Sequence, residues 1–328
     1  MFMKSKINNL TKLMPKKNVI KVGIIGSGFG YYGHYKAFNK ISSCKVVAIV
    51  TRKKINLPKN VKIYSSVKKL ISNENLDLIS IATIPKIQQN LFSQLIKYGA
   101  NLFIEKPLGV NHLNCQKKLS NVKKLKVAIN FTFPEIAEFI YFKKKFIKKE
   151  NKLISINWFF KKLNKSLNKS SDWKQKRKVG GGIIFNYFSH TLYYIEFLFG
   201  KILKIKNIKK TKTLFVCQVI TENNRKINFS LNSDYEKKSR HEIILNEKNS
   251  IKLFSPDALR FDKFNIYVKN KKVIIPNNIK KHGKDKRYLY VAKLLKRYIK
   301  AINTKNSFRP NHIDGLKNLM WLNKIEKI

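Results

Sequence analysis

The sequence is poor in acidic side chains and in cysteine. It has 18 Asp and Glu against 70 Lys and Arg among 328 residues, so its formal net charge at pH 7 is +52. Its three cysteines, Cys44, Cys115 and Cys217, are far apart and lack the paired spacing of a metal site. This usage excludes a disulfide-stapled secreted scaffold and favours a reducing cytoplasm.

Long apolar runs are also missing. No run reaches the length that spans a bilayer, and the basic segment 1–18 lacks the continuous apolar core of a signal peptide. We therefore expect a soluble cytoplasmic protein with no membrane partner, preceded by a basic N-terminal extension over residues 1–18. A hydrophobic content of 43% excludes wholesale disorder, and 328 residues are enough for two domains.

Arginine is scarce within this basic composition. Only eight of the basic residues are Arg, whereas base readout and phosphate recognition favour that side chain. Lysines are spread over the whole chain, together with abundant Ile, Asn, Phe and Tyr, which is typical of the codon bias of an AT-rich genome. We expect no nucleic-acid partner, although a non-catalytic basic binding protein stays open as an alternative.

Strand and helix signals alternate through the first third of the chain. Short apolar runs at 19–26, 45–50, 76–83 and 101–105 are separated by amphipathic segments. This alternation predicts an α/β fold, with a parallel doubly wound sheet of the Rossmann type over residues 19–130.

Beyond residue 130 the pattern changes. Several strand candidates follow residue 200 with no helix between them, and two amphipathic helices are expected near the C-terminus. Residues 131–328 are therefore predicted to form an α+β domain with a large open, mostly antiparallel sheet and C-terminal helices.

A glycine run follows the first predicted strand. Gly26 and Gly28 come where the strand ends and a helix begins, and Phe29 and Gly30 continue the turn. Small residues there let the backbone approach a pyrophosphate at the N-terminus of a helix. The third position of the fingerprint is Tyr31, a bulky residue, so we expect a dinucleotide-binding turn that is slightly rearranged. An ordinary glycine turn is the alternative.

The end of the second predicted strand bears on the choice of cofactor. Thr51 and Arg52 are followed by two lysines, and no acid is present to accept from a ribose 2′-hydroxyl. NADP is therefore favoured over NAD, with the reservation that every loop of this chain is rich in lysine.

Glu105 and Lys106 precede Pro107 at the carboxyl end of another predicted strand. Residues at these ends face the ligand crevice of a parallel sheet. Lys106 is therefore placed to meet a substrate hydroxyl, although the residues alone also fit an ordinary surface turn.

Five segments together carry a resemblance. The segments are residues 22–34, 79–89, 99–109, 180–200 and 308–319. In this order they resemble the Gfo/Idh/MocA family of nicotinamide-dependent oxidoreductases. The resemblance implies a Rossmann domain and a second domain whose open sheet often mediates oligomerisation, so we expect a homo-oligomer, a dimer or a tetramer. It also implies oxidation or reduction of a carbinol on a small-molecule sugar, cyclitol or sugar nucleotide.

The same resemblance implies roles for individual residues. Lys106 matches the lysine of the family's Glu-Lys-Pro motif. His190 matches the histidine of the helix that follows a glycine triplet, here residues 180–182. His190 is the expected acid/base, and Lys106 its partner at the substrate oxygen. Asn186 takes the position where many members have Asp, and a spacing of four predicts that it shares a helix face with His190.

Further residues are expected to line the site. Thr83, Pro85, Glu105 and Lys106 are expected at the cofactor, and Asn130 and Trp173 at the substrate. Gln88 and Ile84 depart from the residues common in relatives, which predicts altered contacts on the nicotinamide side. No metal is expected. A redox-neutral relative, such as a glycosidase-like enzyme that uses bound cofactor, remains an alternative.

Overall fold

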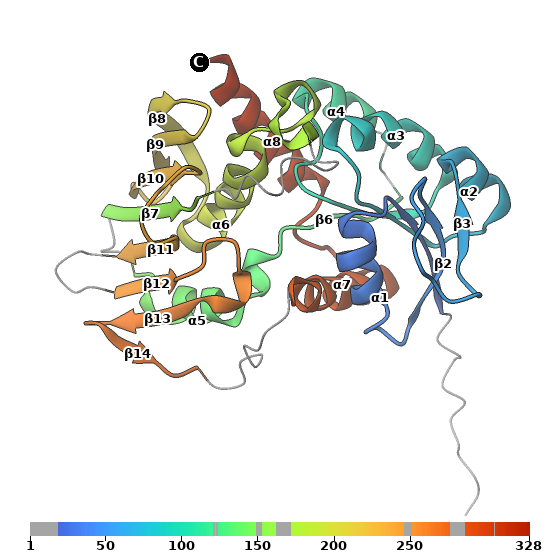
Figure 1. The fold of residues 1–328 in the computed structure, drawn as a ribbon, viewed down its shortest axis with the longest axis horizontal. Helices are drawn as coiled ribbons and strands as arrows, with labels where there is room; N and C mark the ends of the chain where they lie inside the picture. The colour runs from blue at the N-terminus through green and yellow to red at the C-terminus, as the bar shows by residue number, and fades with distance from the viewer. Residues whose placement is uncertain are drawn as a thin grey trace, which may run out of the picture.

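Two β-sheets organise the chain (Figure 1). The structure is a computed structural model that describes residues 19–120, 122, 124–148, 153–161, 172–245, 251–275, 286–304 and 306–328. The basic extension predicted for residues 1–18 lies outside the described residues.

The first sheet has six parallel strands in the order β3-β2-β1-β4-β5-β6. Its central strands are continuous apolar runs because helices cover both faces, which is the arrangement of a Rossmann fold. The predicted doubly wound sheet is confirmed. The strands are β1 (Ile20–Ile25), β2 (Cys44–Val50), β3 (Lys62–Tyr64), β4 (Leu78–Ile81), β5 (Asn101–Ile104) and β6 (Val127–Ile129).

Local signals set the ends of several helices. Pro85 opens α3 and Gly99 ends it in the left-handed conformation, with φ of 93°. Asn111 caps α4, a short helix that was not anticipated from the sequence. The helices are α1 (Lys36–Phe38), α2 (Val67–Asn73), α3 (Pro85–Tyr98), α4 (His112–Leu119), α5 (Ala137–Phe146), α6 (Ser189–Phe199), α7 (Arg287–Thr304) and α8 (His312–Lys327).

The second sheet has eight strands in the order β14-β13-β12-β11-β7-β10-β9-β8. Only the pair β7 and β10 is parallel, so the predicted mostly antiparallel sheet is confirmed. Buried and part-exposed residues alternate along its strands, because only one face packs on the core. The strands are β7 (Leu153–Phe159), β8 (Ile202–Lys210), β9 (Leu214–Thr221), β10 (Lys226–Asn232), β11 (Arg240–Leu245), β12 (Ile251–Ser255), β13 (Asn265–Val268) and β14 (Lys271–Val273).

The C-terminal helices return to the first sheet. In Figure 1 α7 lies beside α1, between the two halves of the molecule. The Tyr298 hydroxyl of α7 shares its hydrogen between the carbonyl oxygens of Leu102 and Lys126, which lie 2.9 and 2.5 Å away. The segment before α8 adds a bridge from Asn311 to Ala128 in β6. The end of the chain thus holds the parallel sheet against the second half.

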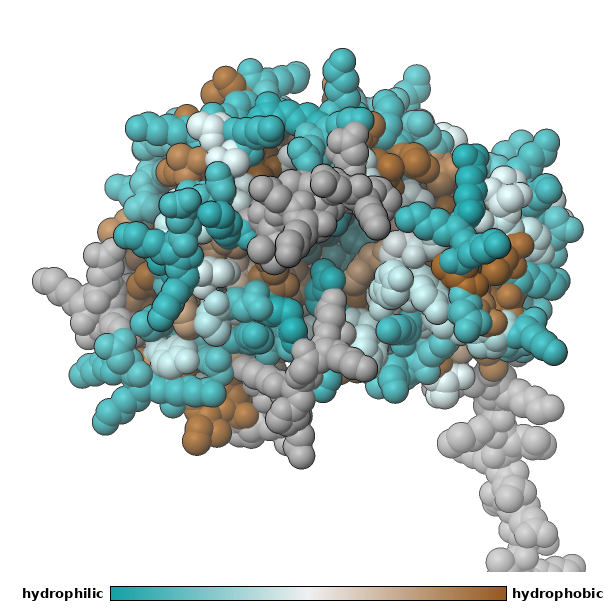
Figure 2. Space-filling view, viewed as in Figure 1, coloured by the Kyte–Doolittle hydropathy of each residue, from teal (hydrophilic) through white to brown (hydrophobic). Residues whose placement is uncertain are grey.

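Hydrophilic side chains are spread over both halves of the face in Figure 2 and do not gather in one patch. This distribution agrees with lysines placed along the whole sequence. In the described part of the chain, no helix is both long and apolar enough to cross a membrane.

A buried histidine lies in the aromatic core of the second half. The His241 ring stacks on Trp158 with centroids 4.1 Å apart, and its Nε2 pairs with the Tyr194 hydroxyl at 3.0 Å. Burial lowers the pKa of His241 from its ordinary value of 6.5 to about 3. The folded protein therefore holds this imidazole neutral where the unfolded chain protonates it.

We expect this histidine to make folding sensitive to acid. Because the unfolded state binds the proton below pH 6.5 and the folded state does not, stability is lost as pH falls through this window. Lowering the pH from 7 to 5 should remove about 2 kcal/mol of unfolding free energy through this one group. Urea unfolding of the wild type and of His241→Gln at both pH values measures it. An equal loss in both proteins would contradict the prediction.

Candidate active site

The glycine turn lies at the carboxyl end of β1. Gly26 has φ of +109°, and a Cβ there would lie 2.3 Å from the Ala82 carbonyl oxygen. At Gly30 a Cβ would meet side chains of Ile24 and Ala82 at 3.2 and 3.3 Å, whereas at Gly28 it would meet nothing within 4 Å. Gly26 and Gly30 thus allow close backbone packing, and Gly28 leaves open space for a ligand.

The expected rearrangement around Tyr31 is visible as a π-helix, Gly30–Tyr35. The Tyr31 hydroxyl reaches the loop after β2, where it donates to the Asn56 carbonyl at 2.8 Å. Tyr31 therefore points toward that loop and does not force the helix away from β1. Gly30 is the residue that lies against the strand.

Thr51 connects the glycine turn to the end of β2. Its hydroxyl donates to Ser27 Oγ at 2.7 Å and accepts from the Lys53 backbone amide at 2.9 Å. The neighbouring Arg52 side chain is exposed. Residues 51–54 bring no carboxylate to this end of the sheet.

Glu105 is held in place by donors from two other elements. Its Oε1 pairs with His34 Nε2 at 2.8 Å and accepts a short hydrogen bond from Asn130 Nδ2. Burial raises the pKa of this carboxyl, but the His34 hydrogen bond and charge, the Asn130 hydrogen bond and the Lys106 charge outweigh it. The pKa of Glu105 is therefore below its ordinary value.

Lys106 spans the two halves of the molecule. Its Nζ donates to the backbone carbonyl of Asn186, at 2.8 Å, just before α6. Burial lowers the pKa of Lys106 to about 8; Glu105 opposes the shift, and the charges of Lys174 and Arg287 add to it. The Lys106 amine thus changes protonation closer to neutral pH than an exposed lysine does.

His190 lies on α6 in an aromatic enclosure formed by three rings. The ring centroids of Phe133, Phe261 and Trp158 are 5.2, 5.6 and 6.3 Å from that of His190. Burial, and then the charge of Lys106, hold the pKa of His190 well below its ordinary value. Its Nδ1 has no hydrogen-bond partner among the described residues. A neutral imidazole of this kind can accept a proton.

Asn186 does not lie in the continuous α-helix that its spacing from His190 predicts. It belongs to a π-helical turn, Ile184–Phe188, which changes the angle between positions four residues apart. Its side-chain amide donates to the Lys174 carbonyl at 3.0 Å, while its own carbonyl accepts from Lys106. Asn186 thus joins the loop before the glycine triplet to the lysine.

The remaining predicted residues surround this centre. Pro85 packs where a Cβ on Gly180 would meet it at 2.6 Å, and the Thr83 methyl lies 3.2 Å from the Cβ position of Gly26. Gln88 donates to the carbonyls of Glu105 and Pro107, at 2.8 and 2.5 Å, and so supports the Glu-Lys-Pro turn. The Trp173 side chain is partly buried, and the backbone of this loop lies against Gly181.

Two residues were not anticipated as part of the site. His34 contacts Glu105, and its partners are far away in the sequence. Arg287, the first residue of α7, lies with its guanidinium carbon 5.3 Å from the Phe29 ring centroid of the glycine turn. It also acts electrostatically on both Lys106 and His190. No local signal marked Arg287, because only the return of α7 brings it to the first sheet.

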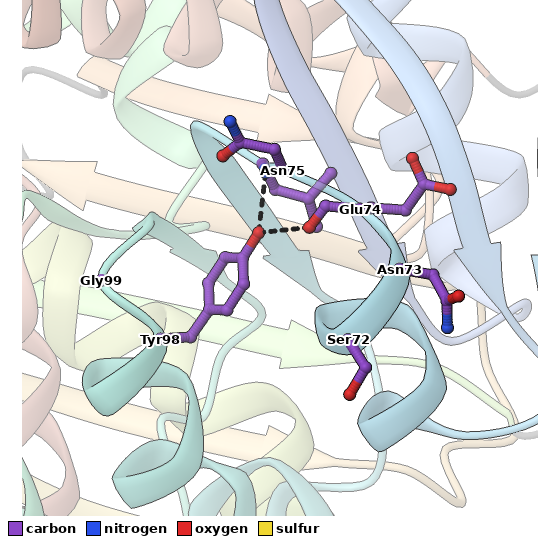
Figure 3. Close-up of a pocket in the computed structure, with 7 residues that line it drawn as sticks. Ser72, Asn73, Glu74, Asn75, Tyr98 and Gly99 are labelled. Carbon is purple, nitrogen blue, oxygen red and sulfur yellow. Dashed lines mark hydrogen bonds between the residues drawn. The ribbon is translucent and has the colours of Figure 1, made fainter.

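A separate pocket of about 470 Å³ lies away from this centre (Figure 3). It is lined by residues 72–76, Tyr98 and Gly99, before β4 and after α3. Tyr98 closes one side, with its hydroxyl donating to the Glu74 carbonyl at 2.6 Å and accepting from the Leu76 amide at 2.7 Å. This is the amino-terminal edge of the parallel strands, opposite the edge where ligands bind.

Comparison with known proteins agrees with the Rossmann fold and the glycine turn described above. Residues 20–133 match the family described as "Oxidoreductase family, NAD-binding Rossmann fold", Gfo/Idh/MocA. A curated, uncharacterized oxidoreductase of Synechocystis sp. is 26% identical over 198 residues, which cover 57% of this chain. The chain matches about half of the length of that relative, 53%.

Solved structures show the same fold over nearly the whole chain. The WlbA dehydrogenase of Bordetella pertussis, in complex with NADH and UDP-GlcNAcA, has a TM-score of 0.72 at 14% identity, covering 94% of both chains. A levoglucosan dehydrogenase, in complex with NADH and L-sorbose, has a TM-score of 0.76 at 13% identity, covering 94% of this chain and 96% of the other.

The parallel sheet has the order of a Rossmann fold, and residues 20–133 match a family model of oxidoreductases with this NAD-binding fold. The matched part, residues 20–133, is thus similar to the NAD-binding domain of the Gfo/Idh/MocA family.

Proposed function

We propose that this protein is an NAD(P)-dependent oxidoreductase that acts on a CH–OH or carbonyl carbon of a sugar, a cyclitol or a sugar nucleotide. The observation that carries the proposal is that Lys106, which comes from the same sheet edge as the glycine turn, acts electrostatically on His190. They belong to different halves of the chain, and each has a pKa lowered by burial and by cationic neighbours. Functional sites collect groups of this kind.

The residues present fit a nicotinamide dinucleotide. Gly28 leaves open space at the carboxyl end of β1, and the amides that follow it open a helix. Thr51 and Arg52 lie at the position that contacts the adenosine ribose in such folds. Phe29, Thr83, Pro85 and Glu105 complete the proposed cofactor-binding set. When bound, the cofactor supplies the carbon that accepts or donates the hydride.

The chain's own side chains manage the proton of the substrate hydroxyl. His190, neutral at pH 7 because its pKa is lowered, accepts this proton as the alcohol is oxidised. Protonated Lys106 donates a hydrogen bond to the substrate oxygen and stabilises its negative charge. Asn186 positions Lys106 through its carbonyl, and through its amide it holds the loop at Lys174, called the substrate loop from here on. Asn130 and Trp173 are proposed to contact the substrate.

The charge of the site favours substrates with an anionic group. Lys174 and Arg287 both add positive charge at Lys106, and Glu105 offsets only part of it, because the pKa of Lys106 remains lowered. A phosphate or carboxylate on the substrate would lower this positive potential. Sugar nucleotides and sugar acids are therefore the first compounds to test. The WlbA dehydrogenase, which has this fold, was crystallised with such a compound.

A titration followed by a screen tests the proposal. Calorimetry with NADH and NADPH, in enough salt to suppress nonspecific phosphate attraction, should give saturable binding at one site per chain. Sugars, cyclitols and UDP-sugars are then screened for cofactor reduction. Exchange of a substrate C–H proton with no net cofactor change would instead indicate the redox-neutral alternative. Absence of cofactor binding would leave the basic binding protein.

We expect a preference for NADP over NAD that depends on Arg52. An exposed arginine beside Thr51, with no acid in residues 51–54, suits a 2′-phosphate. Arg52→Ala should weaken NADPH binding about tenfold, the loss of one charged hydrogen bond, and leave NADH binding unchanged. Calorimetry measures both, with Lys59→Ala, on the same loop, as the matched control. Equal losses for both cofactors would contradict the role of Arg52 at the 2′-phosphate, and tighter binding of NADH by the wild type would make NAD the cofactor.

We also propose that the protein is a homo-oligomer formed through the outer face of the second sheet. Part-exposed apolar side chains alternate there with buried ones, among them Phe159, Ile244 and Phe254. Such a face is suited to burial against a second copy. Light scattering should give a dimer or tetramer for the wild type and a smaller species for Ile244→Asp. Leu113→Asp, an exposed apolar position on α4, is the control. A monomeric wild type would contradict the proposal.

A further inference from the structure

A buried hydrogen-bond network lies directly behind the Glu-Lys-Pro turn. The His34 side chain is fully buried and pairs with Glu105 Oε1 at 2.8 Å through Nε2 and with Ser80 Oγ at 2.7 Å through Nδ1. Its ring packs edge-on against Phe29 and Phe103, with centroids 5.5 and 5.0 Å away. Both ring nitrogens are therefore held by hydrogen-bond partners, and two aromatic rings pack against the imidazole.

The direction of these hydrogen bonds follows from their partners. An ionised carboxylate only accepts, so His34 Nε2 carries a hydrogen and donates to Glu105. The other ring nitrogen, Nδ1, pairs with the Ser80 hydroxyl. Asn130 Nδ2 donates to the same Oε1. Two donors on one oxygen fix the orientation of this carboxylate and keep it ionised.

We infer that His34 is a positioning residue, which holds the Glu105 carboxylate beside Lys106 as the fixed counter-charge of the ammonium. Ser80 orients the His34 ring, and Asn130 provides the second donor. The catalytic consequence depends on the proposed function, but the effect on Lys106 itself does not.

The charges that face Lys106 show why the position of the Glu105 carboxylate affects the protonation of Lys106. Lys174 from the substrate loop and Arg287 from α7 act against its protonation, and His190 of α6 lies near it. Glu105 is the acidic group that opposes them. A carboxylate that turns away or takes up a proton no longer compensates these cations, so Lys106 must release its proton at lower pH.

Competitive labelling measures this effect without a substrate. Trace acetic anhydride is added over a series of pH values, and acetylation of Lys106 is read by peptide mass spectrometry. In His34→Leu, the apparent pKa of Lys106 should fall by about one unit, the effect expected from losing a nearby opposite charge. Glu105→Gln should give the same shift. Lys97, exposed at the far end of α3, is the internal control in every sample.

Milder variants keep the test decisive if His34→Leu fails to fold. Ser80→Ala keeps the imidazole and removes only the hydroxyl that orients it. The pKa of Lys106 should therefore fall by less than in His34→Leu. His34→Gln retains a donor and should restore part of the wild-type value. Unchanged labelling of Lys106 in folded Ser80→Ala, with a normal shift in Glu105→Gln, would overturn the role of His34. If the proposed function fails instead, these labelling shifts remain.

Once a substrate is known, the pH profile gives a second readout. The alkaline limb of kcat/KM should move to lower pH in His34→Leu by the same amount as the labelling curve. In a Lys106→Arg background the guanidinium does not titrate, so adding His34→Leu should leave the pH profile of kcat/KM unshifted. A purely structural role of His34 would lower activity at every pH and leave the limb in place, which would contradict the inference.

Discussion

Lys106→Met should lower kcat/KM about 1,000-fold, because it removes the donor to the substrate oxygen and the positive charge that stabilises it. Methionine keeps most of the side-chain volume, so the fold should persist. NADH affinity should change little, because the ammonium acts mainly on the reacting oxygen. Steady-state kinetics and calorimetry on the same preparation separate the two effects. Lys97→Met, at an exposed position of α3, is the matched control and should behave as wild type.

The pH dependence sharpens this prediction. The rate of alcohol oxidation should rise as His190 loses its proton below pH 6.5, and fall as Lys106 loses its proton near its pKa of about 8. Lys106→Arg, which stays charged, should lack the alkaline limb. A Lys106→Met enzyme within about tenfold of the wild-type kcat/KM would remove Lys106 from the chemistry.

Gly26→Ala should have the second large effect, because the new methyl group finds neither space nor a permitted backbone conformation. Its Cβ would lie 2.3 Å from the Ala82 carbonyl oxygen, and a φ of +109° is unfavourable for alanine. We expect a loss of about 3 kcal/mol in unfolding free energy and roughly a 100-fold weaker affinity for NADH, since the turn must move. Thermal unfolding and calorimetry measure these two quantities.

Gly28→Ala is the matched variant for this test. A Cβ at Gly28 meets no heavy atom within 4 Å, so thermal stability should stay at the wild-type value. Its methyl group occupies the space proposed for the pyrophosphate, so NADH affinity should fall even so. If Gly28→Ala bound NADH as the wild type does, the cofactor would not approach this turn.

The first half of the fold could be predicted because its strands are short, continuous apolar runs that only a buried parallel sheet explains. Lys106 followed from the same reasoning, since it comes directly after such a strand. The second sheet could be predicted as a class but not strand by strand. Residues 251–255 include a lysine, and their alternation of apolar and polar side chains is too weak to predict a strand. They form β12 because β11 and β13 pair with them on either side.

The site was less predictable where local geometry departs from regular helices. A spacing of four places two residues on one face only in an α-helix, and a π-helical turn at residues 184–188 redirects Asn186 to the Lys174 carbonyl. Tyr31 was expected to disturb the glycine turn, but the direction of its side chain toward Asn56 depends on a loop 25 residues away. His34 has partners 46 and 71 residues away, which no local pattern reveals.

The central claim is that Lys106 and His190 serve hydride transfer between a nicotinamide cofactor and a sugar-like substrate. The most direct measurement incubates the purified protein with oxidised cofactor and a panel of sugars, cyclitols and sugar nucleotides, and follows reduced cofactor and oxidised product together. We predict equal amounts of both with one class of compound, and their loss in Lys106→Met. Cofactor binding without reduction by any compound, or turnover that Lys106→Met leaves intact, would contradict the claim.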